Sequence, residues 1–413
     1  MLAATVVTAP AAGKLAAAPP GGSVVRAAAR TMAPAAGRRH GILAAAPAAG
    51  ARARWRAQLN AIFAAVTTPQ APGLAALVRY RGRTIFARGY GRRDLRSGLP
   101  ITPRTDFRLA SCSKQFTAMA VMLLVRAGKL RYDEPLTEVF RHFPAYGAHI
   151  TIRELLNHTS GLQSYGDWMA KKYANQEPWD IPQISDAGVL RFEERQHGTE
   201  FPPGTQWKYS NGGYCLLAMA VERASGMPFA TFLRRRIFLP LGMDHTLAFV
   251  YGGPPVPQRA YGYTLDAGRW MESDQDATSA TLGDGGIYSS IHDLAKWDRA
   301  LNRHTLLSAA RMRPAITPPH LPGPAGGAVP IAGGGFGSAA GAGRPALYGF
   351  GWFLNPWRGH ARMWHNGETV GFRSVIMRFP HDRLTVILLA NRVDLKLPRL
   401  AQRAAALFLR PKS

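Results

Sequence analysis

A serine and a lysine three residues apart open an apolar helical run in this chain. The stretch FRLASCSKQFTAMAVMLLVRAGKL covers residues 107–130 and contains Ser111 and Lys114. Their heads can meet on one helix face, and a lysine held among apolar side chains favours its neutral form and can accept a proton. This pattern predicts a nucleophile and its activator. The alternative is a serine N-cap, followed by a lysine whose charge reaches water.

The second motif places a tyrosine and an asparagine two residues apart at the start of another apolar run. Tyr209 and Asn211 lie in FPPGTQWKYSNGGYCLLAMAVE, between a Pro-Pro-Gly turn and the helical pattern that follows. A second Tyr-x-Asn, at Tyr173 and Asn175, has neither the turn nor the helix. We therefore interpret the second copy as a solvated surface turn.

The third motif is a His-Asn-Gly in MWHNGETVGF, where His365 and Gly367 end one strand-like run and face another across a turn. A histidine there can hydrogen-bond a substrate or the tyrosine, and the glycine lets a substrate backbone approach closely. His142, His158 and His292 are expected to be structural. The chain has no His-Glu-x-x-His, no Cys-x-x-Cys and no phosphate-binding glycine loop after a strand, so we expect no metal and no other cofactor.

The pattern of elements indicates how one scaffold can bring these motifs together. A helix is predicted at about 52–66, and two strands follow around a turn at 81–82. Residues 133–297 are typical of short helices and loops, and four strand-like runs between 347 and 391 precede a last amphipathic helix. We therefore predict an α+β fold: an antiparallel β-sheet flanked by helices, with an inserted, mainly helical subdomain.

Charge and composition set the boundaries of the folded part. The 413 residues include 51 Lys and Arg against 25 Asp and Glu, a formal net charge of +26. Residues 1–51 form a basic low-complexity leader before a predicted domain at 52–410, which contains a Pro/Gly-rich loop at 314–345. Arg38 and Arg39, followed by a weakly apolar stretch, loosely resemble a twin-arginine export signal. Two alternatives stay open: export to the periplasm or cell envelope, or a disordered tail on a cytoplasmic protein.

Several other classes of protein are disfavoured. No uninterrupted apolar run reaches about 18 residues, so no membrane-spanning helix is expected. No zinc finger, helix-turn-helix or RNA-binding signature occurs, so a specific nucleic-acid partner is not expected. Cys112 and Cys215 are too few for a disulfide scaffold and are interpreted as buried free thiols. The oligomeric state is not predicted.

Together, the three motifs resemble those of a known enzyme family. Ser-x-x-Lys, Tyr-x-Asn and His-x-Gly, in this order and with a helical insertion, resemble the penicillin-recognising serine hydrolases. The stretches LLNHTSGL (155–162), FPPGTQWKYSN (201–211), PLGM (240–243) and GDGGIYSS (283–290) look like the branch of class C β-lactamases, D-alanyl-D-alanine carboxypeptidases and related esterases. The resemblance covers roughly residues 55–410 and implies a β-lactamase/transpeptidase-like fold.

The resemblance also implies a role for each motif residue. Ser111 would be the nucleophile, and Lys114 its proton acceptor or relay. Tyr209 would be the general base or acid that passes a proton to the leaving group, and Asn211 would orient Lys114 and the acyl side chain. The backbone N–H groups of Ser111 and Glu368 would form an oxyanion hole.

The third motif departs from most members of that family, which carry Lys where this chain has His365. A charged lysine suits the carboxylate of a penicillin or a D-alanine terminus, whereas histidine is largely neutral at pH 7; this argues against strong β-lactamase activity. We predict a serine hydrolase that cleaves an ester or amide bond of a small-molecule or peptide substrate through an acyl-enzyme on Ser111. The alternative is a catalytically inactive, penicillin-binding-like protein that binds peptides or anionic envelope polymer.

Overall fold

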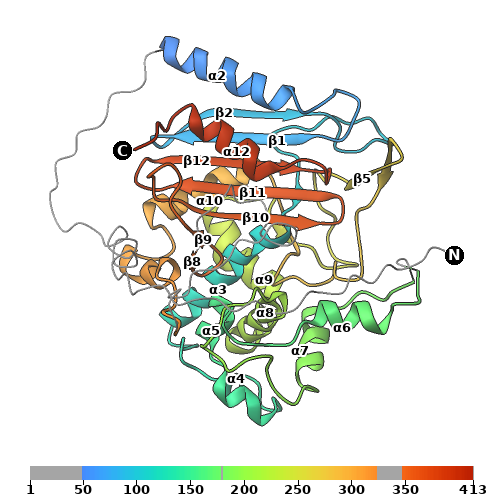
Figure 1. Ribbon diagram of the computed structural model, residues 1–413, viewed down its shortest axis with the longest axis vertical. Coiled ribbons are helices and arrows are strands. Elements are labelled where there is room, and N and C mark those ends of the chain that lie inside the picture. Colours follow the sequence, from blue (N-terminus) through green and yellow to red (C-terminus); the bar gives the residue numbers. More distant parts are fainter. Residues whose placement is uncertain (1–48, 178–179, 323–346, 413) are drawn as a thin grey trace, which may run out of the picture. The chain divides into compact units, whose positions relative to one another are not determined.

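A seven-stranded antiparallel sheet organises the protein (Figure 1). The computed structural model describes residues 49–177, 180–322 and 347–412, and its strands lie in the order β2-β1-β12-β11-β10-β9-β8. They span β1 (Leu74–Tyr80), β2 (Arg83–Tyr90), β8 (Leu347–Tyr348), β9 (Phe353–Leu354), β10 (Met363–Thr369), β11 (Phe372–Phe379) and β12 (Leu384–Ala390). The sheet combines strands from both ends of the described chain, which confirms the predicted α+β fold.

Strands from the two ends of the described chain pair with each other in this sheet. β1 pairs with β2 on one side and with β12 on the other, so that Leu77 lies opposite both Ala87 and Ile387. The β1–β2 hairpin turns at Arg81 and Gly82, with φ of 50° and 80°. The predicted turn is therefore confirmed, and glycine suits its second position because it has no Cβ to clash there.

One face of the sheet packs against two helices from opposite ends of the chain. Side chains alternate between the faces of a strand, and Val78 and Val386 point to the face covered by α2 (Ala49–Ala64) and α12 (Leu397–Ala406). The second helix crosses the sheet in Figure 1. Both helices were predicted, the first with a start three residues later than observed.

A buried ionic cluster joins the other face to α10 (Ile291–Arg303). The Asp298 carboxylate accepts hydrogen bonds from Arg79 of β1, from Arg378 Nε of β11 at 2.9 Å and from Thr385 Oγ1 of β12 at 2.8 Å. All four residues are at most 5% exposed. A buried carboxylate needs such partners to offset its loss of hydration, so this helix is fixed to three strands at one point.

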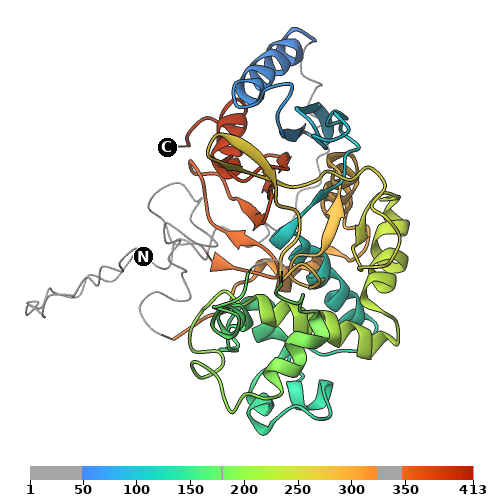
Figure 2. The same ribbon diagram turned by 90° about the vertical axis from the view of Figure 1, so that its right-hand side faces the viewer.

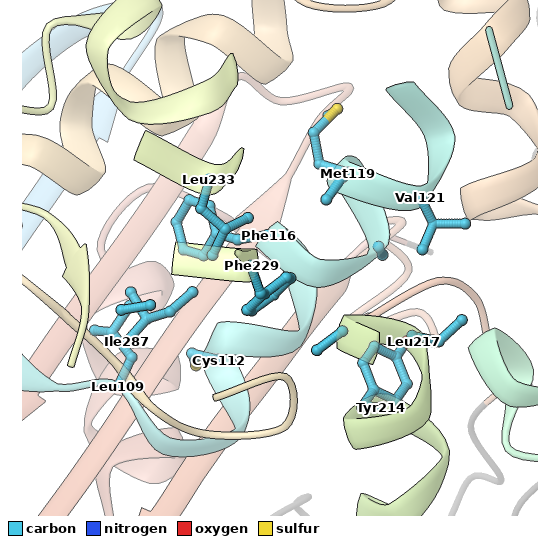
Figure 3. Packing of buried hydrophobic residues seen from close by; sticks show 14 of the residues in the cluster. Leu109, Cys112, Phe116, Met119, Val121, Tyr214, Leu217, Phe229, Leu233 and Ile287 are labelled. Atoms are coloured by element: carbon cyan, nitrogen blue, oxygen red, sulfur yellow. The ribbon is translucent and has the colours of Figure 1, made fainter. Parts of the chain in front are cut away.

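The helix that carries the first motif is the centre of the second core. α3 (Lys114–Arg126) is buried at every residue from Lys114 to Leu124. Phe116 packs on Trp297, with ring centroids 4.5 Å apart. Figure 3 shows Phe116 and Met119 of α3 in the same cluster as Tyr214 of α8 (Asn211–Ser225). This packing fixes both helices that begin at the predicted motifs.

The remaining elements belong mostly to the inserted region, whose helices gather away from α2 in Figure 2. Its helices are α4 (Leu136–Val139), α5 (Ile152–Asn157), α6 (Tyr165–Lys172), α7 (Asp186–Glu193), α8 and α9 (Phe229–Leu233). The region also holds short strands: β4 (Leu247–Ala248), β5 (Tyr263–Asp266), β6 (Arg269–Glu272) and β7 (Ile287–Ser289). β7 lies between β3 (Phe107–Arg108) and β4 in a second sheet. The sequence pattern did not separate these strands from the surrounding loops.

Two predicted segments fall largely outside the described residues. The leader at 1–51 is described only from residue 49, where α2 begins. Of the loop at 314–345, residues 323–345 are not described, while Arg313–Ile316 forms a short 3₁₀ turn after α11 (Ala309–Met312). Within the described ranges, no helix is long and apolar enough to cross a membrane.

Candidate active site

Ser111 lies in a tight turn between a strand and the buried helix. β3 leads into a 3₁₀ turn over Ala110–Ser113, and α3 begins directly after it. Ala110 has φ of 48°, a left-handed conformation that costs roughly 1–3 kcal/mol outside glycine. No side chain caps α3, so Ser111 is not the N-cap that the alternative interpretation required.

Strands from two different sheets hold this turn in place. The N–H of Leu109 donates to the Ile287 carbonyl at 2.8 Å, and the Leu109 carbonyl accepts from Ser374 Oγ at 2.6 Å. A Cβ on Gly367 of β10 would lie 2.1 Å from that same carbonyl oxygen. Only glycine therefore lets β10 approach the serine turn this closely.

Lys114 points its amine into the protein rather than toward water. Its side chain is 0% exposed, so it does not reach solvent as the alternative required. Nζ lies 3.3 Å from Ser111 Oγ and donates to Asn211 Oδ1 at 2.8 Å and to the Asp284 carbonyl at 2.9 Å. The structure thus brings the serine, the lysine and the asparagine together, 97 residues of sequence separating the last two.

The protein environment lowers the proton affinity of this amine. Burial lowers the pKa of Lys114 to about 8, while the charge of Asp284 acts in the opposite direction. The amine also lies 4.9 Å from the ring centroid of Tyr209 and 5.5 Å from that of Tyr214. A lysine with this pKa is partly neutral at mildly alkaline pH and can then accept a proton.

Tyr209 and Asn211 occupy the entrance of α8. Ser210 caps this helix, accepting from the Gly213 N–H at 3.0 Å, which leaves Asn211 as the first helical residue and Tyr209 just before the cap. The phenol oxygen of Tyr209 is buried. Burial raises the pKa of Tyr209 well above 10, and hydrogen bonding with Ser111 opposes that shift. The structure therefore holds a protonated phenol beside the serine.

The sequence pattern placed His365 at the end of a strand. In the structure it lies inside the strand β10. It is the third residue of β10 and is 1% exposed. Its Nδ1 lies 2.6 Å from the Asn366 carbonyl, so Nδ1–H donates there, and Nε2 accepts from the Tyr348 hydroxyl at 3.0 Å. Burial, helped by the charge of Lys114, lowers the pKa of His365 to about 3. Its ring centroid is 6.2 Å from that of Tyr209.

The remaining residues of the third motif line the end of β10. Gly367 approaches the serine turn, and Glu368 follows it, paired with Arg373 across the strands. Glu368 Oε1 accepts from Asn366 Nδ2 at 3.0 Å, and Oε2 lies 3.9 Å from Arg373 Nε. This carboxylate is thus engaged within its own strand pair.

A group of buried acidic residues behind Lys114 was not foreseen. Asp186, at the start of α7, accepts from the N–H groups of Leu282 and Gly283 at 2.8 and 3.1 Å, and Asp284 accepts from the Tyr165 hydroxyl at 3.1 Å. Burial and then the charge of Asp284 raise the pKa of Asp186 to about 7. The GDGG stretch is part of the family resemblance, but the contact of Lys114 uses the backbone carbonyl of Asp284. A backbone contact of this kind leaves no signature in the residue types.

The other histidines and the second Tyr-x-Asn differ in outcome. His158, expected to be structural, is fully buried, with its ring centroid 4.3 Å from that of Tyr209. His142 is exposed, and His292 lies 3.3 Å from Asp293. Tyr173 follows the end of α6 and Asn175 is exposed, as a surface turn requires.

No metal site is evident in the part of the chain that the structure describes. There, no group of three or more His, Cys, Asp or Glu side chains could hold a metal ion. Cys112 and Cys215 are free and buried, and burial raises the pKa of the Cys112 thiol to about 12.

Comparison with known proteins shows the family of this chain. The family model described as Beta-lactamase matches residues 59–410. Penicillin-binding protein 4* of Bacillus subtilis (strain 168) is 32% identical over 328 residues, which cover 76% of this chain and 66% of that protein. This chain thus spans just under two thirds of that relative's length.

Solved structures share the fold. The octameric penicillin-binding protein homologue from Pyrococcus abyssi superposes with a TM-score of 0.70 at 25% identity, covering 86% of this chain and 76% of that one. The D-amino acid amidase from Ochrobactrum anthropi SV3 has a TM-score of 0.67 at 24% identity, covering 86% of this chain and 98% of that one. The amidase likeness concerns the fold alone.

Proposed function

We propose that this chain, which belongs to the Beta-lactamase family, hydrolyses an ester or amide bond through an acyl-enzyme on Ser111. The single observation that carries the proposal is the contact between Lys114 Nζ and Ser111 Oγ, 3.3 Å apart, around an amine that is wholly buried. A lysine kept from water and aimed at a hydroxyl has the geometry of a base that activates a nucleophile.

In the proposed first step, Ser111 Oγ attacks the carbonyl carbon and its proton passes to the neutral amine of Lys114. Asn211 holds that amine by its Oδ1, so the proton acceptor keeps its place during the reaction. The raised pKa of Tyr209 favours the phenol over the phenolate. We therefore assign Tyr209 as the acid that gives its proton to the leaving group and recovers one from Lys114.

The oxyanion that forms at the attacked carbonyl would be held by the backbone N–H groups of Ser111 and Glu368. The close approach of Gly367 to the serine turn supports this assignment, because it brings the two backbone segments together. Losing one donor of this kind typically costs about 10²–10³ in rate. Water then attacks the acyl-enzyme, the C–Oγ bond breaks, and Ser111 regains its proton.

The third motif favours substrates without a carboxylate beside the scissile bond. His365 is neutral at ordinary pH, and both ring nitrogens are hydrogen-bonded within the protein. It therefore offers no charge to a substrate carboxylate, whereas a lysine at this position would be charged. We propose neutral esters and amides as the substrate class, in preference to penicillins.

The test is intact-protein mass after brief exposure to an alkyl fluorophosphonate, which exchanges fluoride for the Ser111 oxygen. We expect a single adduct on the wild type and none on Ser111→Ala. Ser113→Ala is the matched control: it lies in the same turn, but its Oγ accepts from the Ile287 N–H at 3.2 Å, so labelling should persist. A folded wild type without an adduct would refute the hydrolase and favour the inactive binder of peptides or anionic polymer.

A further inference from the structure

A strained histidine ends the helix beside the catalytic tyrosine. His158 follows α5 with φ of 63° and ψ of 38°. Glycine and asparagine are the usual residues in this left-handed position, and other residues there cost roughly 1–3 kcal/mol. His158 is also 0% exposed. A bulky, polar, buried residue in such a conformation requires a compensating role.

The contacts of His158 bracket Tyr209 on both sides. The His158 carbonyl accepts from the Lys208 N–H at 3.0 Å, and Nδ1 accepts from the Ser210 N–H at 3.1 Å. Between these two hydrogen bonds, the imidazole lies against the Tyr209 ring, with centroids 4.3 Å apart and planes at 38°. His158 thus holds the backbone on both sides of Tyr209 and also contacts the face of its ring.

The imidazole is itself held in a defined state. Because Nδ1 accepts a hydrogen bond, the ring proton is on Nε2, and Nε2 is buried with no hydrogen-bond partner among the described residues. Tyr348 and Tyr214 lie around the ring, with centroids 4.5 and 5.1 Å away. Burial, with the charge of Lys114, keeps the pKa of His158 well below 6.5. The fold thus accepts an unpaired N–H, a cost of about 1–3 kcal/mol, in the ring that lies against Tyr209.

We propose that His158 is a positioning residue that fixes the Tyr209 phenol for proton donation to the leaving group. The inference rests on the proposed function but assigns a part to a residue outside the three motifs. It predicts a specific defect: loss of the imidazole should slow reactions whose leaving group needs a proton and spare those whose leaving group does not. General loss of stability would slow both alike.

The experiment compares two phosphonate probes that leave the same adduct on Ser111, one releasing fluoride and the other phenoxide. Rates come from intact mass against time. For His158→Ala we expect the phenoxide probe to react about 10–100-fold more slowly, a partial loss of the roughly 10²–10⁴-fold that a general acid contributes, and the fluoride probe to change far less. His158→Asn should recover much of the rate, because asparagine tolerates this conformation and its Oδ1 can accept from the Ser210 N–H.

His304→Ala is the matched control, because His304 also ends a helix in the left-handed conformation, with φ of 54°, but is exposed. It should leave both rates unchanged. Equal slowing of the two probes in folded His158→Ala, or no slowing, would overturn the inference. So would a wild type that reacts with the fluoride probe alone, since no proton donor would then be in place. Absence of any adduct on the wild type would instead refute the proposed function.

Discussion

Replacing Lys114 by methionine is expected to change how the stability of the protein depends on pH. Burial lowers the pKa of Lys114 from 10.5 in an open chain to about 8 in the folded protein. At 1.36 kcal/mol per pKa unit, this difference corresponds to about 3 kcal/mol of unfolding free energy. Methionine fills a similar volume and has no charge to desolvate, so the variant lacks this term.

The direction in which the free energy of unfolding changes with pH depends on the number of protons that the folded and unfolded states bind. Between pH 8 and 10.5 the unfolded wild type binds more protons at this position than the folded one, so wild-type stability rises with pH there. The penalty is complete below pH 8 and disappears above 10.5. The variant also loses the hydrogen bonds that Lys114 gives to Asn211 and to the Asp284 carbonyl. The free energy of that loss is largely constant over this pH range.

The assay is urea unfolding of wild type and Lys114→Met at pH 7 and pH 9.5. The wild-type free energy of unfolding minus that of the variant should rise by about 2 kcal/mol between these two values. Subtraction removes the titration of groups that both proteins share. Lys129→Met is the matched control, because Lys129 lies just beyond the same helix and is exposed; its difference from wild type should stay flat. An equally flat difference for Lys114→Met would refute the desolvated lysine and, with it, the base of the proposed mechanism.

Three further substitutions test other parts of the structure. Asp298→Ala leaves two buried arginines without their carboxylate and should lower the free energy of unfolding by about 3–5 kcal/mol in urea titration; a loss below about 1 kcal/mol would contradict the buried cluster. Gly367→Ala places a Cβ 2.1 Å from a backbone oxygen of the serine turn, and a shift of that turn should slow fluorophosphonate labelling on the order of 100-fold; unchanged labelling would contradict the close approach. Ser290 caps α10, and its Oγ accepts from the Asp293 N–H at 3.2 Å, so Ser290→Ala should lower the free energy of unfolding by about 1 kcal/mol. Ser308→Ala removes the cap of the short α11. Thermal unfolding of both variants would show whether the loss of stability is larger for the longer helix.

The sequence was informative where short-range patterns decide the structure. The turn at Arg81 and Gly82 defined the first hairpin, and the amphipathic run after the last strand identified α12. The spacing of Ser111 and Lys114 suffices to bring their heads together, because three residues make nearly one helical turn. Local geometry of this kind is encoded by neighbouring residues and is readable from them.

What the sequence could not show depends on distant partners. Ala110 adopts a left-handed conformation that alanine does not favour, so the turn before Ser111 carries no local signal. The sequence indicated that His365 faces substrate at a strand end, but the Tyr348 hydroxyl of β8 donates to its Nε2. His158 was assigned to the scaffold because its contacts with Tyr209 arise from tertiary packing. Such contacts depend on burial and register, which spacing alone does not define.

The pairing of β1 with β12 has a consequence for biosynthesis. Leu74 lies opposite Ala390, so this strand pair joins segments more than 300 residues apart in the order of translation. Closing so long a loop costs only about 0.6 kcal/mol more for each doubling of its length, but it cannot begin until the ribosome has released the last strand. The inserted helical region is complete long before then, and the β1–β2 hairpin must wait with an unpaired, apolar edge. During synthesis, that edge is the part of the chain most in need of protection from other nascent strands.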